Sequence, residues 1–204
     1  DGCQSAGQIP INVKKIRCDF FSSTGRKFLN GPRGTGFLYI NQKIKKYITP
    51  SFIDMTSSKL ISHKRYKTIK SKNLMESFEH SPALKLGLSV AVNNLLEIGI
   101  KKIRKKNVSL SKYLREKLSK NKNIILYENE STLSAINTLD LRNGSIEGLY
   151  NFLRKKEVNT YISSESASFL YFQRIKRKRV LRVSFHYYNN KKEIDYLVKL
   201  IDSY

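Results

Sequence analysis

The stretch of sequence that decides the fold is residues 22–36, which read SSTGRKFLNGPRGTG. Aromatic residues 20–21 precede this stretch, and the apolar residues 37–40 follow it. This order predicts a strand, a glycine-punctuated loop and a second strand. Glycine allows the backbone to take up a positive φ and to approach a ligand closely. The loop holds one lysine, Lys27, whose amine can attack a carbonyl cofactor, and Arg26 beside it can bind an anion such as phosphate.

By spacing alone, a basic glycine-rich loop is also compatible with an ordinary solvated turn. It does not contain the Gly-x-x-x-x-Gly-Lys-Ser/Thr pattern of a P-loop. The chain, however, opens with DGCQ, so that an Asp-x-x-Gln pattern precedes Thr-Gly-x-Lys and Gly-Pro-x-Gly-x-Gly. With this joint pattern, residues 1–40 resemble the cofactor-lysine region of the class V aminotransferase family. Members of that family use pyridoxal 5′-phosphate (PLP), and they include cysteine desulfurases, isopenicillin N epimerase-like proteins and C–S lyases.

The resemblance implies a role for each residue of the pattern. Lys27 would hold the PLP aldehyde as a Schiff base and then move protons as a general base. Asp1 would lie at the pyridine nitrogen, where a carboxylate favours the protonated ring. Gln4 would reach the phenolic oxygen of the ring. Thr24 and Arg26 would bind the phosphate, although many relatives have histidine at the second of these positions.

A second part of the resemblance lies near the C-terminus. Residues 181–184, LRVS, are followed by Tyr-Asn and by Glu-Ile-Asp, as in the family's Arg-x-Ser signature. The resemblance implies that Arg182 grips the α-carboxylate of the substrate, a pairing that suits the planar guanidinium. Asn189 and Glu193 are expected to cap the last helix.

The resemblance also has departures. Group II cysteine desulfurases carry a reactive cysteine in the loop before this arginine, whereas residues 163–170, SSESASFL, contain none. This serine-rich loop is more similar to the epimerase-like and C–S lyase branch. The segment 77–82 looks shortened relative to the family. The chain also begins at a motif residue, so we expect that roughly the first half of a class V enzyme is missing from it.

The expected function is therefore that of a PLP-dependent enzyme that acts on an amino acid through Lys27, with C–S lyase-like β-elimination or cysteine desulfurase-like chemistry. Epimerase-like or aminotransferase activity is an alternative, because fold and family do not fix the reaction. A second alternative is an inactive fragment that serves only as a basic binding module. Relatives are homodimers, so a homodimer is expected of the full-length protein.

Composition limits the partners. The 39 Lys and Arg residues outnumber 16 Asp and Glu residues, which gives a formal net charge of +23. Because these cations are spread along the chain, we expect salt-sensitive, nonspecific binding to nucleic acid and no specific site. No apolar run approaches the roughly 20 residues of a membrane span. The two cysteines do not form a disulfide framework, and the three scattered histidines do not have the spacing of a metal site. This use of cysteine predicts a cytoplasmic location.

The predicted architecture is α/β, with the PLP-dependent transferase fold of fold type I present in part. Residues 1–105 are expected to form part of the large PLP-binding domain and its long connecting helices, and residues 106–204 a small α+β domain. The strongest helical signal begins at a Ser-Pro cap at residues 81–82 and is broken by Gly99. Strands are expected at 11–21, 35–40, 47–53, 124–127, 134–141, 158–162 and 180–185, and further helices at 146–156 and 191–201.

Overall fold

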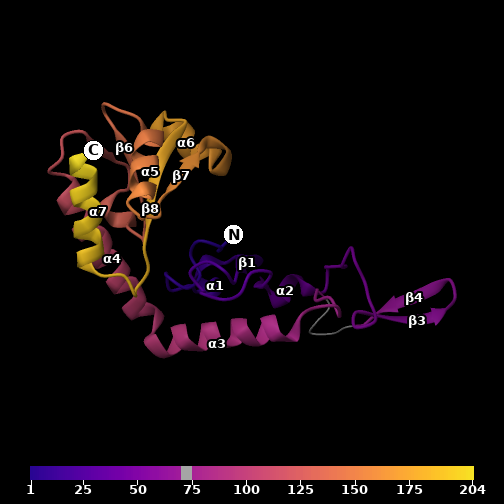
Figure 1. The fold of residues 1–204 in the computed structure, drawn as a ribbon. Helices are drawn as coiled ribbons and strands as arrows, with labels where there is room; N and C mark the ends of the chain where they lie inside the picture. Colours follow the sequence, from indigo (N-terminus) through magenta and orange to yellow (C-terminus); the bar gives the residue numbers. More distant parts are fainter. Residues whose placement is uncertain (70–74) are drawn as a thin grey trace. The chain divides into compact units, whose positions relative to one another are not determined.

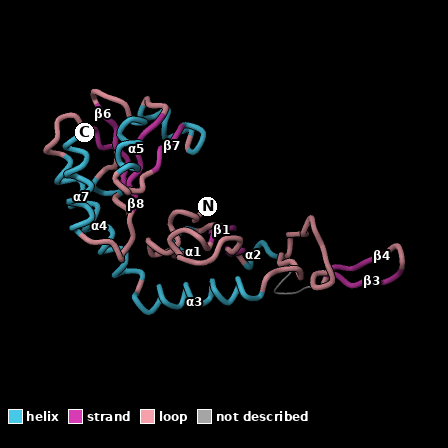
Figure 2. The backbone as a smooth tube through the Cα atoms, viewed as in Figure 1, coloured by secondary structure: helices cyan, strands magenta, loops and turns pink. Residues whose placement is uncertain are grey.

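The structure is a computed structural model that describes residues 1–69 and 75–204. The chain divides into two compact units. Figure 1 shows the ribbon with colours that follow the residue number. Unit 1 consists of Asp1–Ala6 and Ile11–Asn94, and unit 2 consists of Gly7–Pro10 and Leu95–Tyr204. Figure 2 shows short strands in both units and the long helices in the middle of the chain.

Unit 1 is built from short elements and the start of one long helix. Its elements are α1 (Val13–Ile16), β1 (Phe20–Thr24), β2 (Gly36–Ile40), α2 (Gln42–Lys45), β3 (Ser58–Ser62), β4 (Arg65–Thr68) and α3 (Pro82–Ile98), the last four residues of which belong to unit 2. β1 pairs with β2, and β3 pairs with β4, each as an antiparallel two-stranded sheet.

Two strand predictions in unit 1 are wrong. The strand expected over 11–21 begins only at Phe20, because Asn12 caps the short helix α1 by accepting a hydrogen bond from the backbone N–H of Lys15. Arg17 then ends that helix in the left-handed conformation, with a φ of 59°. The segment 47–53 forms no strand. It contains Pro50, which has no N–H to give to a ladder.

The helix predictions in the middle of the chain are confirmed. α3 begins at Pro82, directly after Ser81, and Gly99 separates it from α4 (Ile100–Leu118). Gly99 has a φ of 90°, a conformation that favours glycine over residues with a Cβ. Among the described residues no single helix is long and apolar enough to cross a membrane. The bent pair of α3 and α4 meets that test of length and composition only when the two are counted together.

Unit 2 is a four-stranded antiparallel sheet with helices. The strands are β5 (Ile124–Leu126), β6 (Ile136–Leu141), β7 (Tyr161–Ser164) and β8 (Arg179–Ser184), in the order β5-β6-β8-β7. The helices after α4 are α5 (Ile146–Lys155), α6 (Phe169–Ile175) and α7 (Lys191–Ser203). The strands and helices expected after residue 121 are confirmed within a few residues. Three elements were not predicted: α6 and the 3-10 helices η1 (Glu130–Thr132) and η2 (Glu165–Ala167). The serine-rich stretch before α6 is typical of a loop.

The core of unit 2 contains the apolar faces of its helices. α4 buries Ile103, Leu110, Leu114 and Leu118, which recur at the spacing of one helix face, and it packs against α7. One buried contact reaches this unit from the start of the chain. The side-chain Oε1 of Gln8, which is 1% exposed, accepts a hydrogen bond of 3.0 Å from the backbone N–H of Ala135.

The cap of α7 differs by one residue from the prediction. The N-cap is Asn190, whose side chain accepts a hydrogen bond from the backbone N–H of Glu193, while the Glu193 carboxylate accepts one from the N–H of Asn190. Asn189 supports this capping box from outside, because its Nδ2 donates to the Glu193 carboxylate at 3.2 Å. Both residues named from the sequence therefore lie at the start of α7, but the cap itself is their neighbour.

Candidate functional site

The loop that carries Lys27 is closed by backbone hydrogen bonds. The N–H of Gly25 donates to the carbonyl of Thr35 at 2.8 Å, and the N–H of Gly31 donates to the carbonyl of Gly25 at 2.8 Å. Inside this closure, the N–H of Asn30 donates to the carbonyl of Lys27 at 2.9 Å. Lys27 itself is half-buried. The lysine therefore lies in a tight turn between β1 and β2 whose backbone is fixed at both ends.

Glycines are required in this loop because side chains crowd it. A Cβ on Gly25 would lie 2.1 Å from Oγ1 of Thr35, and a Cβ on Gly31 would lie 2.7 Å from Cδ1 of Leu88 in α3. The Thr35 hydroxyl also donates to the carbonyl of Pro32 at 2.6 Å. The first turns of α3 thus contact the loop, and the glycines allow that close approach.

The N-terminal turn lies against β1, next to this loop. The N–H of Gly2 donates to the carbonyl of Ser22 at 2.7 Å, and the hydroxyl of Ser23 donates to the carbonyl of Gly2 at 3.4 Å. A Cβ on Gly2 would lie 2.0 Å from Cζ of the Phe21 ring, so a larger residue there would require the ring to move. The turn that begins with Asp1 is therefore held on the strand that leads to the lysine.

The five cofactor-binding residues predicted from the sequence all lie in unit 1, on these two segments. The Asp1 carboxylate is exposed and accepts a hydrogen bond of 2.8 Å from the N–H of Cys3, and Gln4 is half-buried. Thr24 ends β1, and its hydroxyl lies 3.5 Å from the carbonyl of Thr35. Arg26 is exposed. The set offers a carboxylate, an amide, a hydroxyl, a guanidinium and an amine, which are the groups a pyridine ring with an aldehyde and a phosphate requires.

Arg182 lies in unit 2, in the middle of β8. It stands opposite Thr138 of β6 and Tyr161 of β7, and its Nε donates to the hydroxyl of Ser184 at 2.9 Å. Burial lowers the pKa of its guanidinium, an effect that Tyr161 opposes. Burial disfavours the charged form, and an anion that pairs with this guanidinium would offset that cost.

Two residues that hold the lysine loop could not be identified from local sequence patterns. Leu88 is on α3, far along the chain from Gly25 and Gly31, and no local pattern links a helix leucine to a distant glycine. From the sequence, Thr35 is an ordinary loop residue. Its role in the loop becomes clear only from the hydrogen bond that its hydroxyl donates to the carbonyl of Pro32. No group of three His, Cys, Asp or Glu side chains in the described ranges 1–69 and 75–204 could hold a metal ion.

Comparison with known proteins identifies the family of this chain. The model of the family described as "Aminotransferase class-V" matches residues 1–197. A protein named probable cysteine desulfurase from Pyrococcus abyssi is 25% identical over 210 residues, which cover 99% of this chain and 50% of the relative. The chain belongs to the class V aminotransferase family.

Solved structures share the fold. The apo structure of the cysteine desulfurase from Thermococcus onnurineus NA1 matches with a TM-score of 0.92 and 22% identity, covering 98% of this chain and 50% of that one. The cystine C–S lyase C-DES, solved with its reaction product cysteine persulfide, matches with a TM-score of 0.81 and 19% identity, covering 99% of this chain and 50% of the other. The protein therefore has the fold of about half of a fold type I enzyme, and it spans about half the length of the relatives it matches.

Proposed function

We propose that this chain supplies the lysine-bearing half of a PLP-dependent enzyme that cleaves a carbon–sulfur bond of an amino acid. The observation that carries the proposal is the closed loop around Lys27, with the Asp1 turn fixed beside it on β1. Membership in the class V family supports the same conclusion. Because the chain spans about half of its relatives, we propose that the active protein contains a second half equivalent to theirs, and that it acts as a cytoplasmic homodimer.

Each residue has a role within the proposal. When bound, PLP supplies an electron sink for charge that forms at the substrate Cα. The Lys27 amine holds the aldehyde carbon and moves the proton at the substrate Cα. Asp1 holds the proton on the ring nitrogen, and Gln4 orients the ring through its phenolic oxygen. Thr24 and Arg26 hold the phosphate.

The substrate contact in the proposal is made by unit 2. The Arg182 guanidinium binds the α-carboxylate of the amino acid in a bidentate manner, for which a planar fork is better suited than an ammonium. Its burial within the sheet supports this role, because a desolvated cation gains more from an anionic partner than an exposed one does.

We favour β-elimination of the C–S lyase type over desulfuration. A desulfurase of group II transfers sulfur to a cysteine in the loop before the substrate arginine, and residues 163–170 of this chain contain none. The two cysteines present, Cys3 and Cys18, belong to unit 1. Cysteine desulfuration is the second candidate, since the Pyrococcus abyssi relative carries that name. An inactive protein that only binds partners is the third.

The test is the visible absorption spectrum of the purified chain mixed with PLP. We expect a band that borohydride fixes to the protein in the wild type and in Lys14→Ala, an exposed lysine of α1, but not in Lys27→Ala. Mass spectrometry of the reduced protein then locates the attached group. Attachment at other lysines in the Lys27→Ala variant would reject the proposed role of Lys27.

The products separate the reactions. β-Elimination from cystine gives pyruvate, ammonia and cysteine persulfide, whereas desulfuration of cysteine leaves alanine. We expect pyruvate from the full-length protein, with both halves present and PLP bound, assayed with cystine in the absence of a reductant and with cysteine in the presence of one. Alanine in place of pyruvate would favour the desulfurase candidate. Attached PLP without either product would favour the inactive one.

A further inference from the structure

The strands β3 and β4 form a separate two-stranded ribbon within unit 1 (Figure 1). Every residue of β4 is exposed, and so is every residue of β3 after Ser58. The N–H of Ile69 donates to the carbonyl of Ser57 at 2.9 Å, which closes the ribbon at its base. The Asp54 carboxylate, just before the ribbon, accepts a hydrogen bond of 2.6 Å from the N–H of Phe78. The ribbon is therefore anchored at its base, while the side chains of its strands are exposed.

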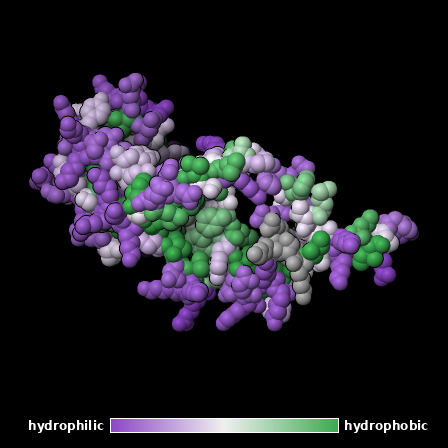
Figure 3. Space-filling view, turned by 90° about the horizontal axis from the view of Figure 1, so that it is seen from below, coloured by the Kyte–Doolittle hydropathy of each residue, from purple (hydrophilic) through white to green (hydrophobic). Residues whose placement is uncertain are grey.

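The register of the ribbon gives its two faces different chemistry. Lys59 lies directly opposite Lys67, and Leu60 lies opposite Tyr66. Because side chains alternate between the two faces of a strand, Arg65 shares a face with Lys67. Lys59, Arg65 and Lys67 thus form a cationic face, and the other face carries Leu60 and Tyr66, which are 70% and 60% exposed. In Figure 3, hydrophobic and hydrophilic residues lie side by side at the right of the view, where the ribbon is found.

The charge of the cationic face is not balanced by nearby acidic residues. Residues 55–75 contain six Lys and Arg residues and no Asp or Glu. None of the salt bridges in the described part of the chain involves the cationic face. Like charges directly opposite each other destabilise a pair of strands. An anion bound between Lys59 and Lys67 would remove this repulsion, so the face is suited to an anionic partner.

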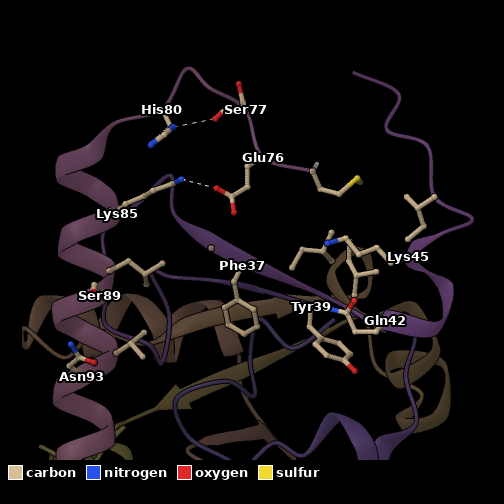
Figure 4. A pocket seen from close by; sticks show the side chains of 17 residues that line it. Phe37, Tyr39, Gln42, Lys45, Glu76, Ser77, His80, Lys85, Ser89 and Asn93 are labelled. Atoms are coloured by element: carbon tan, nitrogen blue, oxygen red, sulfur yellow. Dashed lines mark hydrogen bonds and ion pairs between the residues drawn. The ribbon is translucent and has the colours of Figure 1, made fainter. Parts of the chain in front are cut away.

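Cations at two other places in the protein are already paired with carboxylates. In the groove of about 980 Å³ that β2 and α3 line, Lys85 pairs with Glu76 at 3.0 Å (Figure 4). In the basic stretch 174–179, Arg177 pairs with Asp140 at 2.7 Å. These pairs neutralise the local charge within the protein itself. The cationic face of the ribbon differs from both places, because its charge remains available to a partner.

The arrangement of the two faces selects among anionic partners. A membrane surface would take up the apolar face, which would turn the cations away from the lipid phosphates. Single-stranded nucleic acid is bound where cations and stacking aromatic rings line one groove, whereas Tyr66 lies on the face opposite the cations. The major groove of B-form DNA is about 12 Å wide and admits a two-stranded ribbon, while that of A-form RNA is deep and narrow. Double-stranded DNA is therefore the partner that fits the ribbon.

We propose that the cationic face of the β3–β4 ribbon binds double-stranded DNA through the phosphates that border the major groove, without regard to base sequence. The two lysines and Arg65 each pair with phosphate oxygens, and the guanidinium can do so in a bidentate manner. The net charge of +23 predicts salt-sensitive binding that is spread over the chain, and the ribbon gives this binding a defined site. The proposal does not rest on the proposed function, because no residue of the ribbon takes part in it.

The experiment compares two variants from which the same charge has been removed. The purified chain is titrated into a fluorescently labelled 20-base-pair DNA duplex of random sequence, and anisotropy gives the affinity at several salt concentrations. The ribbon variant is Lys59→Gln/Arg65→Gln/Lys67→Gln. The matched control replaces three exposed lysines of α4, Lys101→Gln/Lys102→Gln/Lys105→Gln.

The salt dependence identifies the contacts. The slope of log K against log salt is about −0.9 for each phosphate contact, so the ribbon variant should lower its magnitude by about 2.7 and the control by less than about 1. At a fixed salt concentration near 0.15 M, we expect the affinity to fall at least tenfold in the ribbon variant and less than about threefold in the control.

A single substitution separates loss of charge from loss of the ribbon. In Lys59→Glu the new carboxylate lies opposite Lys67, and a cross-strand pair of opposite charge stabilises the ribbon while it removes charge from the face. We expect Lys59→Glu to bind the duplex at least tenfold more weakly than the wild type, with an unchanged circular dichroism spectrum.

Four results would overturn the proposal. The first is absence of DNA binding by the wild type, including the case in which vesicles of anionic phospholipid bind instead. The second is an equal loss of affinity in the ribbon variant and the control, which would show that net charge alone drives binding. The third is wild-type affinity in folded Lys59→Glu. The fourth is equal affinity of the wild type for duplex RNA or single-stranded DNA of the same sequence, which would show that the groove of B-form DNA has no part in binding.

Discussion

Cδ1 of Leu88 lies 2.7 Å from the position that a Cβ on Gly31 would occupy, and 3.0 Å from that of a Cβ on Gly25. One helix side chain therefore touches the lysine loop on both sides of Lys27. The contact is a packing contact, so its contribution can be measured by adding a single carbon atom at Gly31.

We expect Gly31→Ala to lower the free energy of unfolding by about 1–3 kcal/mol, because the added methyl overpacks against Leu88. The measurement is urea denaturation followed by circular dichroism. In the double variant Gly31→Ala/Leu88→Ala the clash is relieved, so the combined loss should be smaller than the sum of the two single losses. Strict additivity would contradict the contact. PLP attachment to Lys27 should weaken in Gly31→Ala and recover in part in the double variant.

Replacement of the buried Asn107 of α4 by an apolar residue is expected to stabilise the protein. It is fully buried, and neither Nδ2 nor Oδ1 has a hydrogen-bond partner in the described part of the chain. Burying an unsatisfied amide costs about 1–3 kcal/mol in protein mutants. Asn107→Leu should therefore raise the free energy of unfolding by about 1–2 kcal/mol in thermal or urea melts. The exposed Asn94→Leu is the control, with a change within about 0.5 kcal/mol. Destabilisation by Asn107→Leu would indicate that the amide has a partner in the assembled protein.

Asp54 predicts a dependence of stability on pH. Its carboxylate accepts hydrogen bonds from the hydroxyl and N–H of Thr56 and from the N–H of Phe78, and the first of these contributes most to holding its pKa well below the ordinary value. A group whose folded pKa is depressed contributes stability above its unfolded pKa and loses it as the pH falls.

The matched variant for this prediction is Asp54→Asn, which keeps the shape and removes the charge. The melting temperature of the wild type should exceed that of the variant at pH 7, and the difference should shrink as the pH falls from about 4 towards 2. A difference that stays constant over this range would show that the charge of Asp54 contributes nothing.

Arg182 is tested by a change of KM. In Arg182→Lys the bidentate contact with the substrate carboxylate is lost while a positive charge remains. We expect KM for the amino acid to rise about tenfold or more, which corresponds to about 1.4 kcal/mol, and PLP attachment to Lys27 to stay unchanged. Arg179→Lys on the same strand is the control, because Arg179 is exposed and pairs with Glu147 at 2.7 Å. An equal effect in both variants would argue against a specific role for Arg182.

Much of the architecture could be predicted from local patterns. The Ser-Pro start at 81–82 and the break at Gly99 gave both long helices, because caps and glycine act through the backbone of their own neighbours. Alternation of apolar residues gave the strands of the four-stranded sheet. The strand expected over 11–21 failed because Asn12 caps a helical turn that apolar residues alone do not reveal.

For the candidate site too, some features could be predicted from local sequence and others could not. The motif around Lys27 and the opening Asp-x-x-Gln pattern are readable because they are contiguous and specific. The contacts of Leu88 with Gly25 and Gly31 are not readable, since they depend on tertiary packing between distant segments.

The path of the chain through the two units limits how the protein can be dissected. Residues 7–10 belong to unit 2, while the residues on either side of them belong to unit 1. A single cut after Asn94 would therefore yield a C-terminal piece without Gln8, whose side chain accepts the buried N–H of Ala135. Neither unit is a contiguous stretch of the sequence. A truncated or exchanged unit 1 needs residues 1–6, and a truncated or exchanged unit 2 needs residues 7–10.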